Sequence, residues 1–79
     1  MAALKFYCIG DEDTARGFRL AGVEGRAVAG AAEAAAALAE VAARADLGVI
    51  IISPAAAELV RAKIEALRRE REKPLIVEI

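Results

Sequence analysis

The strongest strand signal in this 79-residue chain is LGVIII at residues 47–52, and it is followed directly by Ser53 and Pro54. A continuous apolar run rich in β-branched residues is typical of a strand that is buried on both faces. Serine supplies an N-cap for a helix, and proline suits the first helical position. The stretch therefore predicts a buried strand that passes straight into a helix, which is the alternation of an α/β protein.

A second apolar run occupies residues 4–9 and ends at Gly10. Its continuous apolar character also favours a strand buried on both faces. Asp11 or Asp13 can cap the following helix, which is expected to run through residues 16–21.

Gly22 lies where glycine often ends a helix. Residues 23–28 form the weakest predicted strand, because Glu24 and Gly25 suit an edge strand better than a central one. High helix propensity over residues 31–45 predicts the next helix. Its buried face would consist of Ala34, Leu38, Val41 and Ala45.

The helix that begins at Pro54 is expected to continue to about Arg69. Val60, Ile64 and Leu67 would face inward, while Arg61, Glu65, Arg68 and Arg69 would form an exposed row of charges. Pro74 then precedes a last strand at residues 75–79.

The resulting pattern, β-α-β-α-β-α-β with short connections, predicts parallel strands joined by right-handed crossovers. We expect one α/β domain over residues 1–79, Rossmann-like or flavodoxin-like, with a four-stranded parallel sheet in the order 2-1-3-4 and helices on both faces. The two most apolar strands would occupy the centre. The topological switch point, where ligands or partners usually lie, would then be the loop from Gly10 to Thr14.

Composition excludes several classes of function. The net charge is −1 and only 4% of the residues are aromatic, so the chain offers neither a basic surface nor stacking platforms for nucleic acid. Glu33, Glu40 and Arg44 interrupt the alanine-rich middle, so no membrane span is expected. The single cysteine excludes an internal disulfide and fits the cytoplasm.

The acidic turn formed by Asp11, Glu12 and Asp13 would repel phosphate, which argues against a nucleotide site. Negative charge also stabilises a helix N-terminus, so capping alone can explain these carboxylates. The alternative is a stand-alone, receiver-like α/β domain that binds a divalent cation there, although Ser53 stands where receiver domains need an aspartate. Cys8 is expected to be a buried core residue. No catalytic, cofactor-binding or metal-binding residue is predicted.

The first helix carries features that capping does not explain. Gly17 costs about 1 kcal/mol relative to alanine inside a helix, so it is expected to mark a close approach to a strand or to another chain. Phe18 and Leu20 are about 200° apart around the helix, so one of them should point outward. With Arg16 and Arg19 beside them, this surface is a candidate for protein docking.

Two N-terminal segments, KFYCIGDEDT at residues 5–14 and GFRLAGVEG at residues 17–25, resemble the F subunit of V-type and A-type ATPases and ATP synthases. Residues 48–52 and 74–79 also resemble that family in order and spacing. The resemblance implies a non-catalytic component of the central stalk, or rotor, with an N-terminal α/β domain and a C-terminal helical tail.

In that family the tail packs beside the coiled coil of the D subunit and reaches toward the catalytic A and B hexamer. The present chain stops at Ile79, which predicts that it corresponds to the N-terminal domain alone. Candidate residues for contact with the D subunit or another component of the central stalk are Asp11, Glu12, Asp13, Arg16, Arg19 and Leu20. Self-association through Ala35, Ala36, Ala39 and Ala43 is a further possibility.

Overall fold

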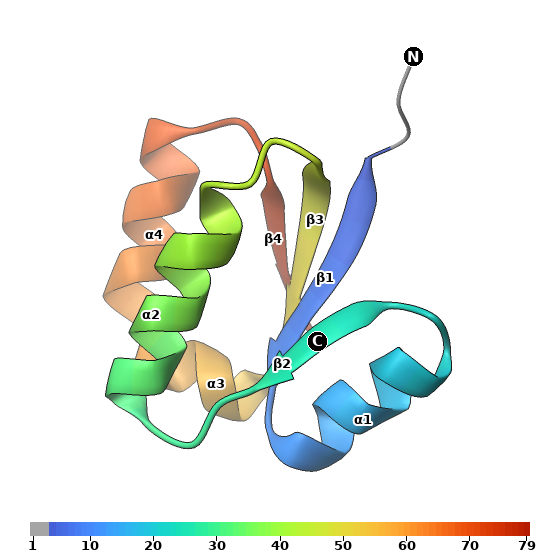
Figure 1. The fold of residues 1–79 in the computed structure, drawn as a ribbon. Coiled ribbons are helices and arrows are strands. Elements are labelled where there is room, and N and C mark those ends of the chain that lie inside the picture. Colours follow the sequence, from blue (N-terminus) through green and yellow to red (C-terminus); the bar gives the residue numbers. More distant parts are fainter. Residues whose placement is uncertain (1–3) are drawn as a thin grey trace.

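A computed structural model describes residues 4–79 and confirms the α/β fold with a parallel sheet in the order β2-β1-β3-β4 (Figure 1). The strands are β1 (Lys5–Gly10), β2 (Glu24–Ala27), β3 (Leu47–Ile52) and β4 (Leu75–Glu78). The helices are α1 (Glu12–Leu20), α2 (Ala31–Ala42), α3 (Pro54–Leu59) and α4 (Arg61–Glu70). As predicted, β1 and β3 are central and β2 is an edge strand.

The main hydrophobic core lies on the face of the sheet that α2, α3 and α4 cover (Figure 1). Alternate residues of the strands point into it, because successive side chains of a strand face opposite sides. From the sheet the core contains Tyr7, Ile9, Leu47, Ile50, Ile52 and Ile76, and from the helices and the Val60 junction it contains Ala34, Ala37, Leu38, Val41, Ala42, Ala56, Ala57, Val60 and Ile64. Apart from Leu47, which precedes the register shift at the start of β3, the alternation along each strand determines which of its residues enter this core.

The opposite face of the sheet carries α1, which packs on β1 and β2 (Figure 1). Ala15 of α1 and Cys8 of β1 are both fully buried there. A Cβ atom added to Gly25 in β2 would lie 3.5 Å from the Ala15 carbonyl oxygen, so the strand and the helix approach closely at this position. Helices therefore lie on both faces of the sheet, as expected.

Beyond α1, the same face is left uncovered by the described residues 4–79 over β3 and β4. The apolar side chains on it include Phe6, Leu75, Val77 and Ile79, which are between 44% and 60% exposed, and the half-buried Val49 and Ile51. We call these six residues the uncovered sheet face. The prediction that β1 is buried on both faces is therefore wrong at Phe6, although it holds at Cys8 and Ile9.

Helix α2 ends at Ala42, three residues earlier than predicted, and Ala45 is exposed rather than part of its buried face. The chain has to turn here in order to enter β3. Arg44 occupies the turn and donates hydrogen bonds to Asp46 at 2.7 Å and to Glu24 at 3.0 Å. Its guanidinium also lies over the Tyr7 ring, 5.6 Å from the centroid. These interactions stabilise the turn in place of another helical turn.

The predicted helix from Pro54 to Arg69 is in fact two helices that meet at Val60. Val60 has φ −134° and ψ 28°, which is outside helical geometry. The break turns the chain between α3 and α4 (Figure 1), and Ala57, Val60 and Ile64 are all buried in the core. Their three- and seven-residue spacing would place them on one face of a continuous helix as well, so helical periodicity gives no sign of the break.

Two residues of the predicted exposed charge row have partners on the sheet. Arg61 is half-buried and donates to Glu78 at 2.6 Å, and Arg68 donates to the carbonyl oxygen of Ile76 at 2.7 Å. Both contacts tie α4 to β4 and its C-terminal end. They could not be read from helical spacing, because their partners come from another part of the chain.

Candidate functional site

The loop after β1 lies at the topological switch point, because β1 is hydrogen-bonded to β2 on one side and to β3 on the other. Asp11 is the N-cap of α1, which decides between the two predicted caps. Its carboxylate accepts hydrogen bonds from the Thr14 hydroxyl at 2.7 Å and from the Thr14 backbone N–H at 3.3 Å. The hydroxyl hydrogen bond lowers the pKa of Asp11, so the cap is ionised at neutral pH.

Neighbouring side chains pack closely around Gly10 in this loop. A Cβ atom at Gly10 would lie 3.2 Å from the Ser53 hydroxyl oxygen and 3.3 Å from the Thr14 Cβ atom. Ser53 is 1% exposed, and its hydroxyl accepts a hydrogen bond from Ala56 at the start of α3. Glycine therefore fits at position 10 without displacing these two side chains, whereas a larger residue would require them to shift.

Two carboxylates of the acidic turn, Asp11 and Glu12, have different partners. Asp11 is turned toward Thr14, whereas Glu12 lies 3.5 Å from Arg16 on the next helical turn. Within residues 4–79, no group of three or more histidine, cysteine, aspartate or glutamate side chains is placed to hold a metal ion. The geometry therefore does not favour the alternative of a cation-binding domain.

Cys8 is fully buried between β1 and α1, as predicted for a core residue. Burial raises the pKa of its thiol, and the negative charge of Asp11 raises it further. A thiol in such surroundings is mostly protonated at neutral pH and is a weak nucleophile.

The outer surface of α1 brings most of the predicted contact residues together. Leu20 is 83% exposed while Phe18 is half-buried, which confirms that one of the two points outward. Glu12, Arg16 and Leu20 follow one another at four-residue spacing and so form one row along the helix. Asp13 and Arg19 are exposed beside this row. Whether these residues contact a partner stays a prediction.

Alanine substitutions at Gly17 in α1 and at Gly22 in the turn after it should have opposite effects on stability. Gly22 has φ +91°, a conformation that alanine adopts with strain, so Gly22→Ala should lower the free energy of unfolding by about 1 kcal/mol. Gly17 is helical, and a Cβ there would meet no described atom within 4 Å apart from its sequence neighbours and its own helix backbone, so no strand approaches it. Gly17→Ala should therefore raise the free energy of unfolding by about 0.5–1 kcal/mol. Urea titration measures both, and a stabilising Gly22→Ala would contradict this account.

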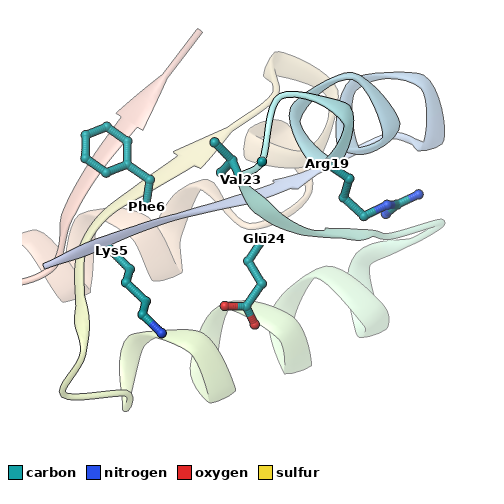
Figure 2. Close-up of a pocket in the computed structure, with 6 residues that line it drawn as sticks. Lys5, Phe6, Arg19, Val23 and Glu24 are labelled. Atoms are coloured by element: carbon teal, nitrogen blue, oxygen red, sulfur yellow. The ribbon is translucent and has the colours of Figure 1, made fainter.

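A hollow at the N-terminal ends of β1 and β2 is shown in Figure 2. Lys5 and Glu24 point to one side of the strands and Phe6 points to the other. Small-molecule sites need a few polar groups that converge on the ligand, and the side chains here diverge. The hollow therefore lacks the arrangement of a ligand site.

Sequence reasoning missed the uncovered sheet face. The signal for it was present in the topology, because crossover connections are right-handed. The step from β1 to β2 moves across the sheet in one direction, and the steps to β3 and β4 move in the other. The connecting helices must therefore lie on opposite faces, with α1 alone on its face within the described chain.

Comparison with protein families matches residues 6–79 to the family described as ATP synthase (F/14-kDa) subunit. Comparison with curated proteins yields no match. Among solved structures, the chain is similar to the F subunit of the V-type ATP synthase from Archaeoglobus fulgidus, with a TM-score of 0.78 and 27% sequence identity over 98% of each chain. No helix within residues 4–79 is long and apolar enough to cross a membrane. Because the family match extends over almost the whole chain, this protein belongs to the ATP synthase (F/14-kDa) subunit family.

Proposed function

We propose that this chain is a non-catalytic component of the central stalk of a V-type or A-type ATPase or ATP synthase. It docks on the D subunit of the stalk and turns with the rotor, which couples ATP hydrolysis or synthesis to ion transport. In this role it is a peripheral, cytoplasmic part of a membrane-bound complex. The observation that carries the proposal is the family match over residues 6–79, which the fold similarity to a V-type F subunit supports.

The local chemistry of the switch-point loop also supports a binding role. In many α/β enzymes this loop holds the reacting groups or the cofactor. Here Asp11 caps α1, Ser53 caps α3 and Glu12 pairs with Arg16, so these polar side chains serve the structure. The outer surface of α1, which begins at this loop, is exposed and is therefore accessible to a partner protein.

The experiment is a binding titration of the chain against the purified D subunit by calorimetry. We expect the wild type to bind and the triple variant Arg16→Ala, Arg19→Ala, Leu20→Ala to bind about tenfold more weakly, since arginine and apolar contacts carry much of the energy of protein interfaces. Arg69→Ala, an exposed change on α4 in the other layer, is the matched control and should bind like the wild type.

Absence of binding between the wild type and the D subunit would refute the docking proposal. Wild-type binding that the triple variant retains in full would instead remove α1 from the contact surface. A version of the chain extended by a family-like C-terminal tail, titrated in parallel, separates docking by this domain from docking by the tail.

A further inference from the structure

The uncovered sheet face is apolar along two rows that cross the sheet. The registers between β1, β3 and β4 place Phe6, Val49 and Leu75 in one row and Cys8, Ile51 and Val77 in the next. Ile79 continues the same face directly after β4, where its N–H donates to the carbonyl oxygen of Ile52. No side chain in these rows is charged, so burial of this surface would remove apolar area from water without desolvating an ion.

The uncovered strip has the width of one helix. Neighbouring strands are about 4.8 Å apart, so β3 and β4 together offer roughly 10 Å, which is about the diameter of a helix with its side chains. α1 stands beside this strip (Figure 1). The position next to α1 is the place where a second helix would complete the layer on this face of the sheet.

One flank of α1 carries mainly small residues. Thr14 places this flank on the side of β3, because a Cβ atom at Gly10 would lie 3.3 Å from Thr14 and 3.2 Å from Ser53, which follows β3. Gly17 and Ala21 follow Thr14 at three- and seven-residue spacing and line the same shallow surface, together with Phe18 and Asp13. A flank of this kind allows a neighbouring helix to approach closely, since little side-chain volume separates the two backbones.

A second copy of this chain fits the strip poorly. The part of α1 that protrudes from this face carries Glu12, Arg16 and Asp13, so a face-to-face dimer would bury charges against apolar side chains. The exposed apolar surface is on the order of 400 Å², about half of the ~800 Å² that each partner of a stable complex usually buries. The surface suits one helix better than a whole domain.

We propose that the uncovered sheet face and the Thr14–Ala21 flank of α1 receive one amphipathic helix from another protein of the stalk. The helix lays an apolar stripe across Phe6, Ile51 and Val77. It presents a lysine or arginine to Asp13, an exposed carboxylate that lies beside Thr14 and Gly17 on α1. This inference rests on the proposed stalk function, because that function supplies a partner protein, and it places the contact beside the outer surface of α1.

The test uses synthetic peptides, so it does not depend on the D subunit. The probe is an 18-residue helical peptide with leucine and alanine along one stripe and lysine on both sides of it. Matched peptides carry glutamate in place of lysine, or the same residues in scrambled order. Methyl NMR spectra of the chain should show shifts at Ile51, Leu75, Val77 and Ile79, whereas Ile50 and Ile64 in the core should not respond.

Val77→Glu should weaken binding of the lysine peptide at least tenfold, because a carboxylate would face the apolar stripe. Leu59→Glu is the matched control, since Leu59 lies on α3 in the other layer and its exposure of 43% is close to the 44% of Val77. It should leave the affinity within twofold of the wild type. If Val77→Glu unfolds in a thermal melt, Leu75→Lys at the more exposed neighbouring site replaces it and should also weaken binding tenfold.

Several results would overturn the inference. The inference is wrong if the scrambled peptide binds as tightly as the lysine peptide. It is also wrong if Val77→Glu and Leu75→Lys both bind the lysine peptide with wild-type affinity. Equal affinity for the glutamate peptide would contradict the role of Asp13. Concentration-dependent shifts at the same methyl groups without peptide, with a dimer in ultracentrifugation, would assign the face to a second copy.

The same variants separate this inference from the proposed function. Binding of the D subunit to the wild type and to Val77→Glu with equal affinity would leave the stalk function standing and exclude the D subunit as the source of the helix. Peptide binding at this face without any binding of the D subunit would refute docking on the D subunit and leave the helix site standing. Gly17→Ala adds a further readout, because the added methyl group should weaken peptide binding severalfold while it stabilises the free chain.

Discussion

Replacement of Ile50 by alanine should lower the free energy of unfolding by about 3–4 kcal/mol, the largest effect expected for a single change in this chain. Ile50 is fully buried at the centre of β3, on the face that α2, α3 and α4 cover. The substitution removes buried apolar surface and leaves a cavity that close-packed neighbours cannot fill. A domain of this size has only about 4–12 kcal/mol of stability in total, so the variant should be close to its unfolding limit at 37 °C.

Ile51→Ala is the matched control, because Ile51 is the next residue of the same strand and faces the other side of the sheet. It is half-buried on the uncovered sheet face, so its truncation should cost clearly less than that of Ile50. Urea denaturation of the two variants measures the difference. Equal losses would contradict a one-sided core and would mean that a further segment covers the other face.

Replacement of Ala37 by leucine should destabilise the protein by about 1–3 kcal/mol, although leucine is nearly as good a helix former as alanine. Ala37 is fully buried where α2 packs on the sheet, in the same core as Tyr7, Leu38 and Val41. Alanine keeps the helix close to the strands, and three additional carbon atoms would force the layers apart. The loss should appear as a fall in Tm of roughly 4–8 °C for each kcal/mol.

Ala36→Leu tests the same helix on its exposed side. It should change the free energy of unfolding by less than about 0.5 kcal/mol, as is usual for surface substitutions. If both leucine variants were neutral in thermal melts, the buried alanines of α2 would serve only as helix formers. A large loss for Ala36→Leu would place that side chain in a contact that the described fold does not contain.

The two candidate surfaces adjoin on one side of the molecule. The outer surface of α1 carries Arg16 and Leu20, and the Thr14–Ala21 flank of the same helix lies on the side of β3. A partner that fills the strip next to α1 would therefore also pass near its charged surface. The binding energy should then reside mainly in the apolar strip, because exposed ion pairs contribute at most about 1 kcal/mol.

Local signals were sufficient for most elements of this fold. The β-branched run of β3, the Ser53–Pro54 helix start and the Gly10 strand end all act through neighbours in sequence, and the structure has each of them at the predicted position. The strand order also followed from sequence, because apolar strands become central and crossovers are right-handed. The resemblance to the F subunit, carried by residues 5–25, agrees with the family match.

The sequence-based predictions were wrong at two helix ends, which helical spacing alone does not determine. Helix α2 ends early where Arg44 pairs with Glu24 of another strand. The break at Val60 has no signal in the helical spacing, because Ala57, Val60 and Ile64 would face one side of a continuous helix as well.

Amino-acid pattern thus determined the class of fold, the strand order and the family, since periodicity, capping and turn residues are local properties of the chain. Only the tertiary structure decided which apolar residues are covered. Val77 and Ile76 are adjacent in one strand and similar in hydrophobicity, yet Ile76 is 7% exposed and Val77 is 44% exposed. Burial depends on whether another segment lies opposite a side chain, and that is a property of the assembled layers.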